Sequence, residues 1–174
     1  MNILFTTAPC VLGLFLVARS EHGVCAILLG DDAAGLARDL QRRFPEAALH
    51  EAGAELAPLV SEVATFLARP AAGFDAVLDV RGSAFHQRVW KALREIPAGS
   101  TETYGHVAAR IGAPEAAKEV GEACAANVLA VAIPCHRVVR KDGGLAGYRW
   151  GVRRKRELLQ REGAPIPETV DFFE

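Results

Sequence analysis

The first 80 residues alternate between short β-rich runs and longer stretches of helical periodicity. Three apolar runs rich in β-branched and aromatic residues come first, separated by Pro9 and by a polar turn, and predict a strand meander at 3–7, 11–18 and 24–29. Apolar residues then recur at helical spacing in 33–44 and in 55–69, which predicts two helices. A last run at 76–80 predicts one more strand. The pattern indicates a small α/β domain, with an antiparallel sheet plus helices, over residues 1–80.

From residue 81 onward the pattern becomes mainly helical. Apolar residues at helical spacing predict a helix over 83–96, and two shorter helices are expected at 104–111 and from Pro114 to about Asn127. Two short helices joined by a glycine-containing turn are the outline of a helix-turn-helix, although a tight helix pair inside a core gives the same pattern. An apolar run, a glycine-rich loop and a basic helix complete a second predicted domain over 81–174.

The acidic and basic residues are distributed unevenly along the chain. Of the 174 residues, 51% are hydrophobic and 24% charged, which is typical of a globular protein with a real core. The net charge of −1 hides an asymmetry, because residues 1–80 hold five Lys or Arg against ten Asp or Glu. Residues 137–161 hold nine cations against two acids. That basic block indicates either a polyanion-binding surface or a solvated basic helix.

The cysteines and the N-terminal residues bear on location. Cys10, Cys25, Cys124 and Cys135 form no CxxC pair, and in a chain of this size they are typical of reduced thiols in the cytosol. The N-terminal segment lacks the basic start of a signal peptide, and no apolar run approaches the ~18 residues that a membrane span needs. We therefore expect a cytoplasmic protein with no membrane association.

The stretch IPCHRVV places a thiol beside an imidazole and a row of cations. A free cysteine has a pKa of about 8.5, and an adjacent base or a cationic field raises its thiolate fraction. Neighbours in an extended strand point to opposite faces, so Cys135 and His136 are expected to communicate through a water. A histidine base also needs a carboxylate on its other nitrogen, for which Glu162 is the first candidate and Glu157 the second. A core cysteine next to a surface histidine is the alternative interpretation.

The chain resembles the O6-alkylguanine-DNA alkyltransferases. The segments that carry the resemblance are TYGHVAARIG, IPCHRVV and GYRWGVRRKRELLQREG; the similarity is dense over 81–163 and weaker over the first 80 residues. It points to the bacterial type, including the C-terminal domain of the bacterial adaptive-response regulator. The resemblance implies a ribonuclease H-like N-terminal domain and a winged-helix-like C-terminal domain that contains the helix-turn-helix.

The resemblance also implies an activity and its central residues. Members of this family transfer an alkyl group from O6 of a guanine, and in some cases O4 of a thymine, to their own cysteine, irreversibly and without a cofactor. By resemblance Cys135 is the acceptor, ionised at the lip of a cavity that the flipped base enters. His136 removes the thiol proton through a water, and Glu162 holds His136.

Further residues of this chain match the family's site. Asn127 matches an asparagine that ties the recognition helix to the active-site turn, and Tyr104 matches a tyrosine beside the flipped base. Lys155 matches a lysine near the sulfur. The expected partner is double-stranded DNA, bound by a monomer in the minor groove with the damaged base flipped out. The residues expected to contact DNA are Lys118, Ala125, Ala126, Arg137 and Tyr148.

Two features separate this chain from the family pattern. Lys118 stands where the family has an arginine that fills the gap left by the flipped base, and Glu119 stands where a small residue is usual. Lysine cannot stack as a planar guanidinium does, so weaker binding to duplex DNA is expected. Some relatives bind structural zinc, but Cys10, Cys25 and His22 are too scattered here, and no metal is expected.

Three alternatives differ in class. A protein that only binds and flags lesions would lack the reactive cysteine, which Cys135 argues against. A methylation-sensing regulator would need further DNA-binding domains, for which this chain has no room. A cysteine hydrolase would need an oxyanion hole and a distant histidine, and the sequence offers neither.

Overall fold

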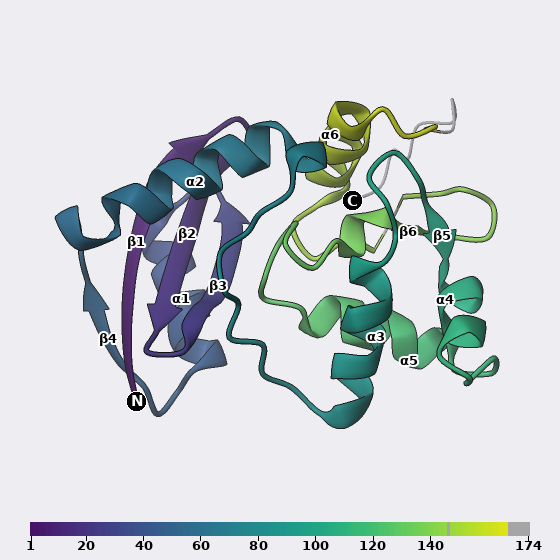
Figure 1. Ribbon diagram of the computed structural model, residues 1–174, viewed down its shortest axis with the longest axis horizontal. Coiled ribbons are helices and arrows are strands. Elements are labelled where there is room, and N and C mark those ends of the chain that lie inside the picture. Colours follow the sequence, from purple (N-terminus) through teal and green to yellow (C-terminus); the bar gives the residue numbers. More distant parts are fainter. Residues whose placement is uncertain (146, 167–174) are drawn as a thin grey trace. The chain divides into compact units, whose positions relative to one another are not determined.

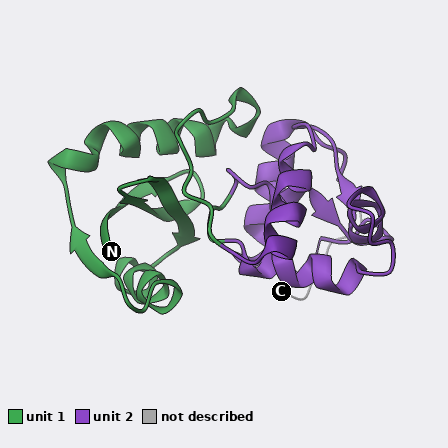
Figure 2. Ribbon diagram, turned by 60° about the horizontal axis from the view of Figure 1, so that its bottom comes forward, with its two compact units in different colours: residues 1–81, 128–130 green, residues 82–127, 131–174 purple. Residues whose placement is uncertain are grey.

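The computed structural model describes residues 1–145 and 147–166, and the chain divides into two compact units. Unit 1 comprises residues 1–81 and 128–130 (Figure 2). Unit 2 comprises 82–127 and the described residues from 131 onward. The chain therefore enters unit 2, returns to unit 1 for three residues, and re-enters unit 2 just before Cys135. No helix among the described residues is long and apolar enough to cross a membrane.

Unit 1 is built on a mixed four-stranded sheet (Figure 1). Its strands are β1 (Asn2–Cys10), β2 (Gly13–Ser20), β3 (Gly23–Gly30) and β4 (Ala48–Glu51), in the order β3-β2-β1-β4. The predicted meander of β1, β2 and β3 is confirmed as antiparallel. The prediction of a wholly antiparallel sheet is wrong, because β4 pairs parallel to β1 after a helical crossover from β3.

The strand predicted at 76–80 is also wrong. The segment meets β3 only at the isolated bridge between Val24 and Leu78. Two backbone hydrogen bonds flank that bridge, from Val24 N to Val77 O at 2.9 Å and from Asp79 N to Val24 O at 2.8 Å. The Val77 side chain is 72% exposed. Of the apolar residues in this segment, Leu78 therefore pairs with β3 and Val77 lies in solvent, so the segment does not form a further strand of the sheet.

Two helices cover the sheet of unit 1 on opposite faces (Figures 1 and 2). Helix α1 (Ala33–Arg43) contacts β2 and β3, and α2 (Ala57–Ala68) contacts β1 and β2. The Asp32 side chain caps α1 by accepting a hydrogen bond from Gly35 N at 3.0 Å. Short 3-10 turns lie on either side of α2, at Ala54–Leu56 and Pro70–Ala72. The core between these layers is apolar.

Unit 2 is mainly helical, as predicted. Its elements are α3 (Ala84–Arg94), β5 (Glu102–Thr103), α4 (Tyr104–Arg110), α5 (Ala117–Ala126), the 3-10 turn η3 (Cys135–Arg137), β6 (Val138–Val139) and α6 (Val152–Glu162). Helices α4 and α5 pack together through a turn in which Gly112 has φ +78°, a conformation that favours glycine. Helix α5 begins three residues later than Pro114, because residues 114–116 form a turn before it. The Trp90 indole joins α3 to α5 by donating to Ala123 O at 2.8 Å.

Candidate active site

Cys135, which the sequence predicts to be a nucleophile, lies inside unit 2 at the start of η3. Cys135 is 3% exposed. The Asn127 amide, which follows the last residue of α5, donates one hydrogen bond to Ile133 O at 2.9 Å and one to Cys135 Sγ at 3.3 Å. Asn127 is itself 1% exposed. A single buried amide therefore fixes both the turn before the cysteine and the sulfur atom to the end of α5.

The turn between Asn127 and Cys135 contains one strained residue. Val131 has φ +68°, and it is the one non-glycine residue with positive φ in the described chain. A β-branched residue rarely adopts this conformation, because its side chain crowds the backbone. Val131 is 2% exposed, so packing holds it there. The sequence gives no sign of this strain.

His136 and Glu162 lie in contact in the interior. His136 Nε2 is 3.0 Å from Glu162 Oε1, and both side chains are fully buried. The same carboxylate accepts from Arg137, whose Nε lies 3.1 Å from Oε1 and whose Nη2 lies 2.5 Å from Oε2. Arg137 Nη1 also donates to Ile96 O at 2.7 Å. Glu162, the last residue of α6, is thereby joined to two consecutive residues of η3, and the alternative carboxylate Glu157 pairs with Arg161 instead.

Electrostatics assign a protonation state to each member of this pair. Burial raises the pKa of Glu162, but the contacts with His136 and Arg137 outweigh burial and leave that pKa below its ordinary value, so Glu162 is a carboxylate. Burial lowers the pKa of His136 more than Glu162 raises it, so the imidazole is neutral. With its proton on Nε2 toward Glu162, the imidazole has Nδ1 as a base. Neither ring nitrogen makes a well-aligned hydrogen bond within the described residues, so the 3.0 Å approach of Nε2 to Glu162 Oε1 is an ion-pair contact.

Burial of Cys135 disfavours the ionised sulfur that the sequence predicts. Burial raises the pKa of Cys135, and the hydrogen bond from Asn127 and the charge of Lys155 lower it only in part. The sulfur is therefore a protonated thiol, and it lies in the interior instead of at an open lip. The cause is that desolvation disfavours the charged form more than the neighbouring cations favour it. Any nucleophilic reaction of this sulfur would therefore require loss of the thiol proton.

Three more of the predicted side chains surround the thiol. Lys155 on α6 is fully buried, with Nζ 6.0 Å from the centre of the Tyr148 ring. Tyr148 is buried, and its hydroxyl has no hydrogen-bond partner among residues 1–145 and 147–166. Burial raises the pKa of Tyr148, and the nearby Cys135 raises it further. Burial also raises the pKa of Tyr104 to about 12. Both phenols are therefore proton donors at neutral pH.

The residues predicted to contact DNA fall into two groups. Lys118 and Ala125 are exposed on α5, and Ala126 is half-buried at its end. Tyr148 and Arg137 are interior, and the Arg137 side chain is only 10% exposed because it pairs with Glu162. Because the Arg137 side chain is buried, the structure does not favour the predicted contact with DNA. Arg137 instead holds the Glu162 carboxylate in place.

Sequence reasoning missed two residues near the thiol. Cys124 is buried in α5, where its charge would raise the pKa of Tyr104. Arg149 donates from Nη1 to Ala125 O at 2.8 Å and lies 5.6 Å from the Trp150 ring centre. It stabilises the C-terminal end of α5, where a cation is favourable. The signal that could have found Arg149 is its place between two aromatic residues in GYRWG.

Metal ligands are the remaining question for this site. In the part of the chain that the structure describes, no three His, Cys, Asp or Glu side chains group closely enough to hold a metal ion. Cys10 lies at the end of β1 and Cys25 in β3, and neither joins such a group with His22. The expectation of no metal stays a prediction.

Comparisons with known proteins agree on one family. Residues 84–164 match the model of the 6-O-methylguanine DNA methyltransferase DNA-binding domain. The chain is 52% identical over 162 residues to the bifunctional transcriptional activator/DNA repair enzyme Ada of Escherichia coli, covering 93% of this chain and 46% of Ada, so it spans about half the length of that relative. It is 45% identical over 115 residues to the methylated-DNA–protein-cysteine methyltransferase of Mycobacterium tuberculosis, covering 66% of this chain and 70% of the relative.

A solved structure extends the comparison to the fold. The crystal structure of the Mycobacterium tuberculosis methyltransferase in complex with DNA matches with a TM-score of 0.73 and 33% identity, covering 95% of this chain and 96% of the other.

Proposed function

Because the chain belongs to the 6-O-methylguanine DNA methyltransferase family, we propose that it repairs DNA by transferring the alkyl group of O6-alkylguanine to Cys135. The observation that carries the proposal is that Cys135 and the next residue, His136, are both buried, with Glu162 Oε1 3.0 Å from the imidazole Nε2. The same chemistry extends to O4-alkylthymine, and no cofactor takes part. A protein that only binds lesions would not need this cysteine.

The reaction begins with loss of the thiol proton. His136 Nδ1 takes the proton of Cys135 through a water, and the imidazolium that forms is stabilised by the Glu162 carboxylate. Asn127 donates to the sulfur and favours the thiolate, as does the charge of Lys155. Arg137 keeps the carboxylate in place. Ionisation of the buried Cys135 thiol costs free energy, so the thiolate forms only as the reaction proceeds.

The alkyl transfer itself is a displacement at carbon. The thiolate attacks the alkyl carbon, the S–C bond forms, and the C–O6 bond breaks with its electron pair going to the guanine. The guanine anion takes a proton from the hydroxyl of Tyr104, and that phenolate recovers its proton from the imidazolium of His136. The products are an S-alkylated Cys135, neutral guanine and a neutral His136. Each molecule reacts once, because the thioether is not converted back to a thiol.

DNA binding is proposed to use α5. The exposed Lys118 and the small residues Ala125 and Ala126 suit a helix that approaches the minor groove closely while the damaged base is flipped out. Tyr148 would form a wall of the base pocket, with its hydroxyl available to the substrate. Lys118 and Glu119 would weaken binding relative to an arginine-bearing relative.

The finer points of the fold are part of the same proposal. The strand order β3-β2-β1-β4, with β4 alone parallel, supports a ribonuclease H-like N-terminal unit. The α4–α5 pair beside the short strands β5 and β6 supports a winged-helix-like unit. The division into domains at residues 80 and 81, the monomeric state and the cytoplasmic location stay predictions.

Intact mass spectrometry tests the proposal. Incubation with a duplex that contains O6-methylguanine should add one methylene, about 14 Da, to one peptide, the one that contains Cys135. The gain should stop at one per chain. Cys135→Ser should give no gain, whereas Cys124→Ser should still react. A gain mapped to Cys124, or none in the parent protein, would overturn the assignment.

A further inference from the structure

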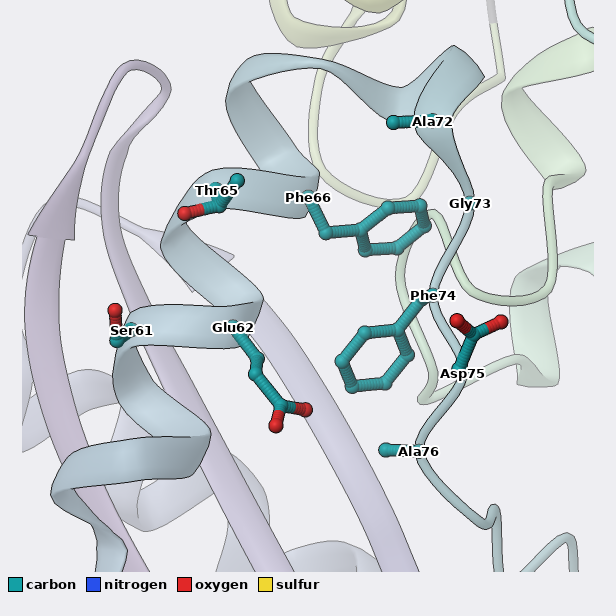
Figure 3. A pocket seen from close by; sticks show the side chains of 9 residues that line it. All are labelled: Ser61, Glu62, Thr65, Phe66, Ala72, Gly73, Phe74, Asp75 and Ala76. Atoms are coloured by element: carbon teal, nitrogen blue, oxygen red, sulfur yellow. The ribbon is translucent and has the colours of Figure 1, made fainter.

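Unit 1 contains an open hollow between α2 and the chain that follows it (Figure 3). Its volume is about 490 Å³, within the range of roughly 300–1,000 Å³ typical of ligand sites. One wall is a face of α2, and the other is the segment 72–76, which begins at the last residue of the 3-10 turn Pro70–Ala72. The lining residues on α2 are Ser61, Glu62, Thr65 and Phe66. The catalytic groups all lie in unit 2, so this hollow has no part in the proposed reaction.

Two stacked phenylalanines form the apolar part of the hollow. The rings of Phe66 and Phe74 lie 5.1 Å apart at an interplanar angle of 16°. Phe66 is buried and fixed by the core, whereas Phe74 is only half-buried. In the view of Figure 3 the Phe74 ring lies between the carboxylates of Glu62 and Asp75. The Phe74 ring is thus stacked on a buried ring, with the Glu62 carboxylate on the side of α2 and the Asp75 carboxylate on the other side of the segment.

The negative charge of the hollow favours a cationic ligand. Its lining includes two carboxylates, Glu62 and Asp75, and no basic residue. Both carboxylates are exposed, and neither has an ion-pair partner among the described residues. Residues 1–80 carry twice as many acids as cations, so a nucleic acid is repelled here. A cation with a flat, weakly hydrated head suits an aromatic ring flanked by carboxylates.

We propose that this hollow binds an arginine side chain from a basic segment of a partner protein. The guanidinium stacks on Phe74 and donates to Glu62 and Asp75, while the hydroxyls of Ser61 and Thr65 accept from the adjoining peptide. Lysine fits less well, because its ammonium is compact and strongly hydrated. Exposed ion pairs are individually weak, so the contact is a transient docking that salt weakens.

Titration of the ¹⁵N-labelled full chain with the blocked peptide Gly-Arg-Arg-Gly tests the site. Amide shifts should saturate and concentrate in residues 61–76. The double variant Glu62→Gln, Asp75→Asn should bind roughly tenfold more weakly, and Phe74→Leu should weaken binding about threefold. Glu55→Gln is the matched control, because Glu55 is an exposed carboxylate just before α2 that does not line the hollow. It should bind the peptide as the parent does.

Three results would overturn the proposal. If the parent bound the blocked peptide Gly-Lys-Lys-Gly as tightly as Gly-Arg-Arg-Gly, the proposed preference for arginine would be wrong. If the double variant bound Gly-Arg-Arg-Gly as tightly as the parent, the peptide would not bind in this hollow. Self-association of the parent, lost in the double variant on sedimentation, would make the occupant a second copy of this chain. Alkyl transfer by all variants should equal that of the parent, so failure of this proposal is separable from failure of the proposed function.

Discussion

The two units differ in what they bury. Of the buried polar or charged residues of the described chain, Ser20 alone belongs to unit 1, and its hydroxyl donates to Asp79 at 2.6 Å. Unit 2 buries Asn127, His136, Arg137 and Lys155, together with the Cys135 thiol. Burying such groups costs free energy unless each is paired. The buried polar and charged side chains are therefore concentrated in unit 2, where the candidate catalytic groups lie, whereas the core of unit 1 is almost wholly apolar.

Substitution of Glu162 tests the reactive side of this comparison and should have the largest effect. Glu162→Gln removes the charge that stabilises the imidazolium and leaves Arg137 with a weaker partner. We expect alkyl transfer to slow by about 100-fold or more, because general-base catalysis contributes roughly 10²–10⁴. Single-turnover transfer from an O6-methylguanine duplex measures it.

Glu157→Gln is the matched control for that experiment. Glu157 lies on the same helix, and its side chain is 40% exposed and pairs with Arg161 at 3.3 Å. Its loss should leave the transfer rate within about twofold, because exposed pairs of this kind contribute little. Similar losses in both variants would show that helix α6, and not its last carboxylate, is what matters.

Substitution in unit 1 should reverse the pattern. Leu40 is fully buried in α1, so Leu40→Ala should lower the free energy of unfolding by about 2–5 kcal/mol. At a temperature where the variant stays folded, the transfer rate should match that of the parent. Urea unfolding and single-turnover transfer, measured on the same preparation, separate the two effects. A proportionate fall in rate would mean that the core of unit 1 tunes the chemistry.

The pH profile sharpens the assignment of the base. Since the pKa of His136 is lowered below its ordinary value near 6.5, the imidazole stays a base down to and below pH 6.5, and transfer should slow only in more acid solution. The pKa of Glu162 is also lowered, so its carboxylate stabilises the fold at pH values above the ordinary glutamate pKa. That contribution to the free energy of unfolding is lost as the pH falls through the lowered pKa of Glu162. A rate that halves near pH 7 would contradict the burial of His136.

The smallest expected effect lies on the surface of α5. Lys118→Arg replaces a point charge by a planar guanidinium, which, under the proposed base flipping, would stack in the gap that the base leaves. We expect transfer from duplex DNA to quicken about threefold, while reactivity toward a single-stranded oligonucleotide changes less. Unchanged rate and affinity for duplex would show that Lys118 does not weaken DNA binding.

Local patterns in the sequence predicted much of this structure, and packing decided the remainder. The meander, both helices of unit 1 and the α4–α5 pair follow from periodicity and turn residues. The contact between His136 and Glu162 was predicted from the need of a base for a carboxylate, and the structure brings the two together. The parallel pairing of β4 and the neutral thiol could not be predicted, because they depend on long-range pairing and on desolvation.

The position of Glu162 at the last residue of α6 has a consequence for where the chain can be cut. Helix ends fray, but here Gly163 adopts φ +74°, and the N–H groups of Gly163 and Ala164 return to Gln160 O and Leu159 O at 3.0 and 2.9 Å. Ala164 is buried in a cluster with Leu145 and Leu159. A chain truncated after residue 162 would keep every proposed proton-transfer group and still lose the order that aligns them. We therefore expect that the shortest chain able to carry out the proposed transfer extends through the capping residues Gly163 and Ala164.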